Sequence, residues 1–233
     1  MNPDLTTPDA PADIQTLRRL MFGRATCRAY LPQQVPEAVI RSLVEVARGT
    51  ASWCNTQPWD VVITSGASTE RFRQALTEQV RLDPGLHADF DFPDEYKGVY
   101  LERRRASGFQ LYEALGIGRG DKERRDAQSF ENFRLFGAPH VAIITVPQEL
   151  GPYGAVDAGG FVCSFLLSAQ AHGVATTPQA ALAMQSKFIR GYFGIPEARR
   201  MVCGISFGYA DTAHPVNGYR TSRADVDDIL RLV

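Results

Sequence analysis

Two groups of arginines, one near each end of the chain, are the residues best suited to bind a charged ligand. Arg24, Thr26 and Arg28 are spaced two residues apart, and Arg220 and Arg223 lie close to the C-terminus. In an extended segment the first three would point to one side and could bind a dianion together. A phosphate monoester carries close to two charges at neutral pH, so both groups could share it. The alternative, solvated arginines on an edge strand, is favoured by the spacing alone because so short a motif is weakly specific.

The segment 52–59 concentrates aromatic, amide and hydroxyl side chains in eight residues, Ser-Trp-Cys-Asn-Thr-Gln-Pro-Trp. Loops usually consist of small polar residues, so this composition is costly for a simple connection. Asn55 and Gln57 could offer hydrogen-bond donors and acceptors to the edge of a flat heteroaromatic ring. Segment 177–180, Thr-Pro-Gln-Ala, could add backbone groups.

No side chain stands out as a catalytic acid, base, nucleophile or metal ligand. The four histidines lack paired metal-binding spacing, and the four cysteines form no CxxC pair. Segment 204–208 matches GxSxG, but the residues after it cannot begin the helix that a nucleophile elbow needs, so we interpret it as a buried strand. A site without reactive groups of its own indicates that a cofactor carries the reaction. A phosphate plus a flat ring with hydrogen-bonding edges describes flavin mononucleotide (FMN).

The composition is that of a soluble globular protein of 233 residues with a net charge of −1. This balance gives no field that would attract nucleic acid or anionic lipid. The longest apolar run, around 159–167, is too short to span a bilayer, and the first residues do not resemble a secretory signal. We therefore expect a reduced, cytoplasmic protein without a metal and without nucleic-acid or membrane partners.

The elements that position these residues alternate without a linker, which predicts one domain over 12–233 after a flexible N-terminal arm over 1–11. A helix over 157–171 is apolar on all sides, so we expect it at the centre of the domain or of a dimer interface. Few strands separated by helices indicate an α+β sandwich. The other predicted helices are 13–22, 36–48, 69–82, 97–115 with a break near Gly108, 121–135 and 225–232; the predicted strands are 60–64, 140–146 and 201–209, and 177–180 is predicted to be a turn.

Four segments in chain order resemble the signature of the FMN-dependent nitroreductase family, and the resemblance extends from about residue 17 to the C-terminus. A basic residue, a Thr, a second basic residue and an aromatic occur within 24–30. Asn-Thr-Gln-Pro-Trp at 55–59 follows a helix and is the most specific element. A Cys-Pro-Gln-like turn appears as Thr-Pro-Gln at 177–179, and 208–223 carries the C-terminal pattern with both arginines.

The resemblance implies an α+β, nitroreductase-like sandwich, in which helices flank a central, mostly antiparallel sheet, and an intertwined homodimer. Two FMN molecules would lie at the subunit interface, each touched by both chains. The arginine groups would hold the phosphate and ribityl chain, Asn55 would bond the ring, and the 177–180 backbone would face its N5 side. Some relatives carry a Glu after the proline; this chain does not, so no side-chain role is assigned there. The candidate cofactor-binding residues are Arg24, Thr26, Arg28, Asn55, Gln57, Thr177, Pro178, Gln179, Ala180, Arg220 and Arg223.

The resemblance also implies an oxidoreductase that passes hydride from NADH or NADPH through flavin N5 to a nitroaromatic or similar electron-poor small molecule, in a ping-pong cycle. Trp53, Tyr112 and Phe133 are candidates to sandwich an aromatic acceptor, although each is equally suited to the core, and Trp59 is expected to pack beneath the cofactor. Two alternatives stay open. One is an FMN-dependent reductase of enones, quinones or halogenated phenols, and the other is a non-enzymatic flavin-binding dimer.

Overall fold

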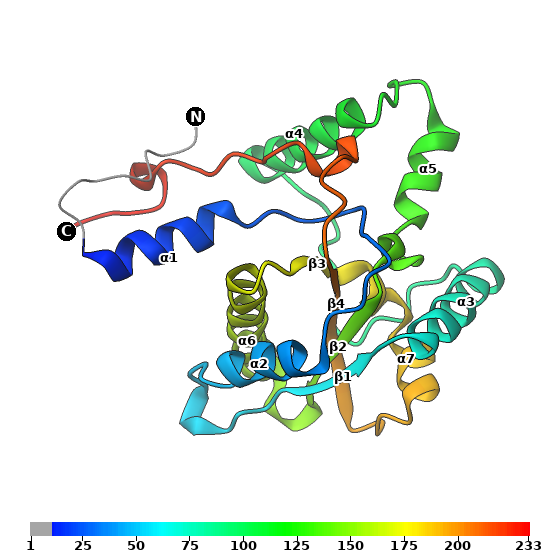
Figure 1. The fold of residues 1–233 in the computed structure, drawn as a ribbon, viewed down its shortest axis with the longest axis horizontal. Helices are drawn as coiled ribbons and strands as arrows, with labels where there is room; N and C mark the ends of the chain where they lie inside the picture. Colours follow the sequence, from blue (N-terminus) through cyan, green and yellow to red (C-terminus); the bar gives the residue numbers. More distant parts are fainter. Residues whose placement is uncertain (1–10) are drawn as a thin grey trace.

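A single antiparallel sheet organises the protein. The computed structural model describes residues 11–233, so the predicted N-terminal arm lies almost wholly outside the described residues. In the described part, four strands form a sheet in the order β1-β2-β4-β3 (Figure 1). Asp60 pairs with Thr145, and Thr177 pairs with Ser206. The strands are β1 (Asp60–Thr64), β2 (His140–Pro147), β3 (Ala175–Gln179) and β4 (Arg199–Gly208).

Helices cover both faces of this sheet. One core joins the sheet to α2 and α6, and a second joins it to α3 and α7. Side chains alternate along β2, because successive residues of a strand point to opposite faces: Ala142 and Ile144 enter the first core, Val141 and Ile143 the second. The helices are α1 (Ala12–Gly23), α2 (Glu37–Ala47), α3 (Ala67–Leu82), α4 (Gly98–Ala114), α5 (Lys122–Phe130), α6 (Gly151–Ala171) and α7 (Ser186–Phe193).

Helix α6 is the longest helix of the first core. Phe161 is fully buried, and the Trp59 ring stacks on it with centroids 5.1 Å apart, which gives Trp59 a packing role. The helix is not buried all round as expected, since Tyr153 and Val156 are 56% and 67% exposed. The stretch 148–171 is long and apolar enough to cross a membrane, so the expectation that no segment has that length is wrong. A core helix meets the same criteria, and α6 packs against the sheet.

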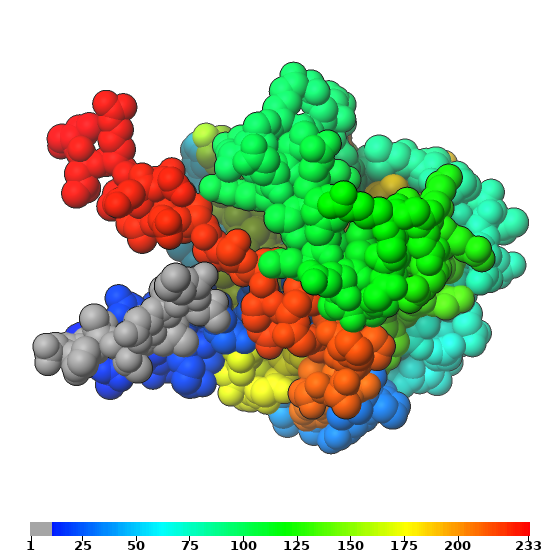
Figure 2. Space-filling view, turned by 90° about the horizontal axis from the view of Figure 1, so that it is seen from above, coloured from blue at the N-terminus to red at the C-terminus, as the bar shows by residue number. Residues whose placement is uncertain are grey.

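Helices α1, α4 and α5 and the C-terminal segment contribute little to the two cores. Within the described chain, none of these three helices contains a buried residue. The C-terminal segment runs away from the sheet on the same side as α1, and both project from the body of the molecule (Figures 1 and 2). Apolar side chains such as Leu17, Met21, Ile229 and Leu232 are exposed there. One copy of the chain therefore leaves a substantial apolar surface uncovered.

Most expected elements are confirmed to within two residues at each end, but the middle helices differ. α4 is continuous through Gly108, because one glycine inside a helix costs only about 1 kcal/mol. α5 ends at Phe130 rather than at Leu135. Leu135 and Phe136 have φ values of 58° and 51°, so the helix cannot extend through them. α6 begins at Gly151, six residues earlier than expected.

The predicted secondary structure of two further segments, 177–180 and 225–232, is also wrong. Segment 177–180 is not a turn, because residues through Gln179 form the edge strand β3. Pro178 is tolerated there since an edge strand does not need every N–H for the ladder. The expected C-terminal helix over 225–232 is reduced to the 3-10 turn Val226–Asp228.

Candidate functional site

The segment 24–30 lies along the edge strand β3, extended as its alternating pattern predicts. Thr26 forms a parallel bridge with Thr176, and the Cys27 N–H donates to Thr176 O at 3.0 Å. Thr177 Oγ1 donates to Cys27 O and lies 2.7 Å from Tyr30 Oη. The basic N-terminal segment and the Thr-Pro-Gln strand, about 150 residues apart in sequence, are thus side by side.

The C-terminal segment packs against segment 24–30. The Arg28 N–H donates to Asn217 Oδ1 at 2.8 Å, and Arg28 Nη1 donates to Tyr219 Oη at 2.7 Å. Asn217 Nδ2 returns two bonds, to Ala29 O and Asp211 O. Asn217 therefore holds the C-terminal segment against the basic segment 24–30, a role that its residue type and position did not predict. The only sequence signal was its place in the C-terminal pattern at 208–223.

Arg24 and Arg223 form a cationic pair, and neither belongs to a salt bridge within residues 11–233. Burial lowers the pKa of the Arg24 guanidinium, the nearby charge of Arg223 lowers it further, and Cys163 opposes both effects. Arg24 Nη1 is buried and has no hydrogen-bond partner in the part of the chain that the structure describes. Arginine stays charged in proteins, so it does not relieve this situation by losing a proton. A phosphate between the two guanidinium groups would supply both the missing acceptor and the missing negative charge, so these residues fit the FMN phosphate.

The other C-terminal arginine is placed differently. Arg220 Nη1 donates to Asn217 O and Tyr219 O, both at 2.8 Å, so its side chain folds back on its own segment. Arg223 Nη1 also contacts its own segment, through Thr221 and Ser222, but stays exposed. Of the two, Arg223 is the one whose charge reaches Arg24.

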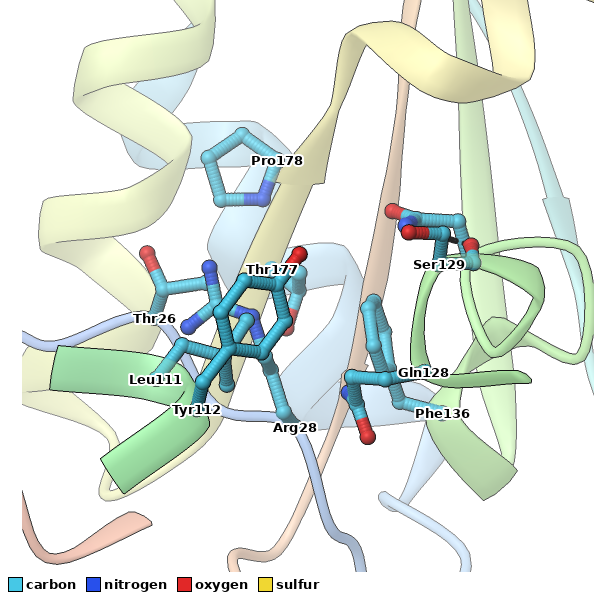
Figure 3. Close-up of a pocket in the computed structure, with 10 residues that line it drawn as sticks. Thr26, Arg28, Leu111, Tyr112, Gln128, Ser129, Phe136, Thr177 and Pro178 are labelled. Atoms are coloured by element: carbon cyan, nitrogen blue, oxygen red, sulfur yellow. Dashed lines mark hydrogen bonds between the residues drawn. The ribbon is translucent and has the colours of Figure 1, made fainter. Parts of the chain in front are cut away.

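A pocket of about 200 Å³ opens beside these segments (Figure 3). In the close-up, Thr26, Arg28, Leu111 and Tyr112 lie at one side, and Gln128, Ser129 and Phe136 at the other. The pocket is lined by Thr26, Arg28, Leu111, Tyr112, Gln128, Ser129, Asn132, Phe136, Thr177 and Pro178. Five of the predicted residues thus meet in one place: Thr26, Arg28, Tyr112, Thr177 and Pro178.

The far wall of the pocket comes from the end of α5 and was not assigned from sequence. Gln128, Ser129 and Asn132 contribute polar groups to it. Their stretch was predicted as helix, with its aromatic residues assigned chiefly to the core, and nothing in its pattern distinguished these three polar residues. Phe133, a candidate acceptor contact, instead packs with Phe130 against the second core.

The remaining residues of the 177–180 segment, Gln179 and Ala180, do not line this pocket. Gln179 is 2% exposed, and its side chain is fully engaged in hydrogen bonds with Ser206 and Asn132. Ala180 begins a 3-10 turn and is exposed. Burial raises the pKa of the neighbouring Tyr30 hydroxyl well above its ordinary value, so Tyr30 remains a neutral structural group.

The amide-rich turn lies elsewhere in the same copy. The Trp53 N–H donates to Asp157 Oδ2 at 3.1 Å, and the Trp53 ring meets Tyr153 edge-on, so this turn sits on the first turns of α6. Strand β3 follows the other end of α6 (Figure 1). Asn55 and Gln57 are exposed, and among the described residues that line the pocket, none belongs to 52–59.

The backbone of this turn is strained. Cys54, Asn55 and Gln57 have φ values of 50°, 56° and 47°, a region that Asn enters readily but Cys and Gln rarely do. The Gln57 N–H donates to Ser52 Oγ at 2.9 Å, which helps to hold this shape. Strained backbone of this kind occurs preferentially at ligand-binding sites. The turn thus has the features of a binding element, but it does not contribute to the pocket beside β3.

The residues excluded as catalytic groups are structural. Ser206 is fully buried within β4, as expected for a strand rather than a nucleophile elbow. His140 Nε2 accepts from the Val35 N–H at 2.9 Å and Nδ1 donates to Thr64 O at 3.0 Å, while burial lowers its pKa. Over residues 11–233, no cluster of three His, Cys, Asp or Glu side chains could hold a metal ion.

Comparisons with known proteins place the chain in one family. The family model described as the nitroreductase family matches residues 21–209. Nitroreductase NfnB of Mycolicibacterium smegmatis is 38% identical over 97% of each chain, and a 4-nitrobenzoate reductase of a Nocardioides species is 34% identical over 92% of this chain and 88% of its own.

Solved structures agree. The FMN-dependent nitroreductase NfnB from Mycobacterium smegmatis, solved in complex with NADPH, superposes with a TM-score of 0.89 at 37% identity, covering 94% of this chain and 98% of that one. An FMN- and NADPH-dependent NfnB from sphigopyxis sp. strain HMH gives a TM-score of 0.88 at 28% identity, with coverage of 92% and 97%. The match in sequence and in fold shows that the chain belongs to the nitroreductase family.

Proposed function

We propose that the protein is an FMN-dependent oxidoreductase that uses NADH or NADPH to reduce nitroaromatic or similar electron-poor small molecules. The observation that carries this proposal is the buried Arg24 Nη1 beside Arg223, which has no hydrogen-bond partner among residues 11–233. It is joined by a pocket that Thr26 and Arg28 of the same segment line and that no Asp, Glu or His lines. When bound, FMN supplies the redox chemistry, accepting hydride from the nicotinamide and giving it up to the acceptor. Two relatives are named for FMN, NADPH or 4-nitrobenzoate, which agrees with this assignment.

The chain's own contribution is positioning and electrostatics. Arg24 and Arg223 would hold the phosphate, and Thr26 and Arg28 would contact the remainder of the cofactor from the same extended segment. The bond from Arg28 to Tyr219 fixes the guanidinium before any ligand arrives. A preorganised positive group in a half-buried site stabilises negative charge that develops nearby, without a cost of reorientation. The backbone of β3 would form the floor beneath the ring.

We further propose that two copies of the chain build each site, with Asn55 and Gln57 contributed by the second copy. The pocket in one copy, about 200 Å³, is smaller than the roughly 300–1,000 Å³ of typical cofactor sites. The 52–59 turn has the strain and chemistry of a binding element, and none of its residues lines the pocket. Exposed apolar residues on α1, α6 and the C-terminal segment offer the surface for a homodimer. NAD(P)H dependence agrees with a cytoplasmic location.

The function is tested by steady-state turnover. The purified protein, loaded with FMN, should oxidise NADH or NADPH when 4-nitrobenzoate is added, and chromatography should show loss of the nitro compound in proportion. Enones, quinones and halogenated phenols serve as competing acceptors in the same assay. Turnover with one of these classes but not with nitroaromatics would contradict the proposed substrate class. Oxidation of the nicotinamide that leaves every acceptor unchanged would contradict the reductase function.

A further inference from the structure

Gln179 is a buried side chain that the proposed function does not use. Its Oε1 accepts from Ser206 Oγ at 2.5 Å, and its Nε2 donates to Asn132 O at 2.8 Å and to Asn132 Oδ1 at 3.3 Å. With 2% exposure, it has almost no contact with solvent. A buried amide whose bonds run to two different segments connects those segments directly, because each unmade bond would leave a polar group unpaired.

The two segments differ in how firmly they are held. Ser206 is fully buried in the central strand β4 and pairs with Thr177 in the sheet. Asn132 lies just beyond α5, is partly exposed and lines the pocket. In the described chain α5 has no buried residue, so its position depends on contacts outside the two cores' buried residues and on the attachment of its C-terminal end, next to Asn132. Phe130 and Phe133 pack against the second core at this end, and the Gln179 bonds are the polar part of the attachment.

We propose that Gln179 is a positioning residue that ties the α5 wall of the pocket to the β3 floor and so sets the width of the pocket. Gln179 and Pro178 are neighbours on β3, so their side chains leave opposite faces of the strand. Pro178 lines the pocket, whereas Gln179 is buried and bonds Ser206 and Asn132. Asn132 is held at the level of the floor, and Gln128 and Ser129 are carried with it. The consequence for acceptor binding rests on the proposed function, whereas the positioning of α5 does not.

The chain offers a matched control in Gln185. This residue is also a buried glutamine, 1% exposed, whose Nε2 donates to two backbone carbonyls, Asp83 O at 3.3 Å and Gly85 O at 3.1 Å. Neither carbonyl belongs to a residue that lines the pocket. Replacing either glutamine by methionine keeps the approximate shape and removes the bonds that its Nε2 donates to another segment. The two differ at the carbonyl, because Gln179 Oε1 accepts from Ser206 Oγ, whereas Gln185 Oε1 has no hydrogen-bond partner among the described residues. Gln185→Met therefore controls for the loss of the donated bonds, and Ser206→Ala for the loss of the accepted one.

The test is hydrogen–deuterium exchange of the FMN-loaded protein, followed at the amides of residues 128–137. Gln179→Met should accelerate exchange there about tenfold, since opening of this segment loses two hydrogen bonds, and Gln185→Met should leave it unchanged. Ser206→Ala, which removes only the anchor in β4, should accelerate it less and in the same direction. If Gln179→Met does not fold, the exchange rates of Ser206→Ala test the proposal in its place.

Kinetics provide the second readout. Gln179→Met should raise KM for 4-nitrobenzoate about three- to tenfold with kcat changed less than about twofold, because the wall binds the acceptor but takes no part in the transfer. Wild-type exchange rates at 128–137 in both Gln179→Met and Ser206→Ala would overturn the proposal, as would equal acceleration by Gln185→Met. If the wild type reduces no acceptor while the exchange results hold, the proposed function fails and the role of Gln179 stands.

Discussion

Arg24 combines a half-buried guanidinium, an unpaired N–H group and a neighbouring positive charge from Arg223. If a phosphate fills this gap, Arg24→Ala should weaken FMN binding by about 1.5–3 kcal/mol, a factor of about 10–150 in Kd, the scale of a charge-assisted hydrogen bond. The measurement is quenching of FMN fluorescence on titration with the unloaded protein.

Arg41→Ala is the matched control, since Arg41 is an exposed arginine on α2 whose partner is Glu37. Its FMN affinity should equal that of the wild type. Wild-type affinity in Arg24→Ala as well would mean that the phosphate binds elsewhere on the chain.

His140 predicts how stability depends on pH. Burial lowers its pKa, with the hydrogen bond to Thr64 O opposing, so the folded imidazole stays neutral while the unfolded one protonates near its ordinary value of 6.5. The unfolded state therefore binds more protons below this pH. The free energy of unfolding should fall as the pH decreases below about 6.5, by up to about 1.4 kcal/mol per unit, until the folded pKa is reached.

Urea denaturation at pH 7.5 and at pH 5.5 measures this effect. His140→Asn should be less stable at both values but should lose less between them than the wild type does. His172→Asn, at an exposed position on the end of α6, should keep the wild-type loss. An equal loss in the His140 variant would show that other groups cause the pH dependence.

Among the elements, the 52–59 turn stores backbone strain that substitution can release. Cys54 has a φ of 50°, which glycine adopts freely and other residues adopt at a cost of about 1–2 kcal/mol. Glycine also makes the unfolded chain more flexible, at a cost of about 0.4–1 kcal/mol. Cys54→Gly should therefore raise the free energy of unfolding by about 0.5–1 kcal/mol, as measured in urea.

Ala51→Gly gives the comparison within the same turn, since Ala51 is not among the residues with positive φ. This variant should be destabilised by about 0.5–1 kcal/mol. Similar destabilisation by both substitutions would show that the φ of Cys54 carries no strain.

Elements with a strong local pattern could be predicted from the sequence, and elements defined by distant partners could not. The run Asp60–Thr64 is bounded by Pro58 and Gly66, and its β-branched residues define β1 correctly. Strand β3 contains only five residues, one of them Pro178, and owes its strand form to pairing with β4. The positive φ values of Leu135 and Phe136 exclude helical backbone at the C-terminal end of the predicted helix over 121–135, and no propensity of these residues indicates them.

The residues of the candidate site also include some that the sequence predicted and some that it did not. The arginine and threonine pattern at 24–28 has a chemical signature, and the structure places Thr26 and Arg28 at the pocket. The polar wall from the end of α5 has no such signature, because Gln128 and Asn132 face the pocket only through the packing of α5. The separation of Asn55 from this pocket is a property of the tertiary fold, so spacing along the chain gave no sign of it.

At the scale of the whole molecule, the uncovered face of α6 predicts a dimer on which cofactor binding depends. Val156 is 67% exposed on that face. Val156→Glu would place a charge in a desolvated interface, at a cost of several kcal/mol. The variant should sediment as a monomer in analytical ultracentrifugation and should lose most of its FMN affinity, since the second copy no longer supplies the 52–59 turn.

Leu82→Glu controls for the charge itself, because Leu82 is 77% exposed at the end of α3, on the other side of the sheet. It should remain dimeric and bind FMN normally. A Val156→Glu monomer with wild-type FMN affinity would show that one copy holds the cofactor by itself.

One anaerobic absorption experiment decides whether the chain is an FMN-dependent reductase. The protein is loaded with FMN, freed of unbound flavin, and titrated under nitrogen with NADH or NADPH, then with 4-nitrobenzoate. About one equivalent of nicotinamide per flavin should bleach the visible flavin band, and the nitro compound should restore it. A flavin that stays bound and yellow in the presence of both nicotinamides, or a protein that retains no FMN, would contradict the proposed function.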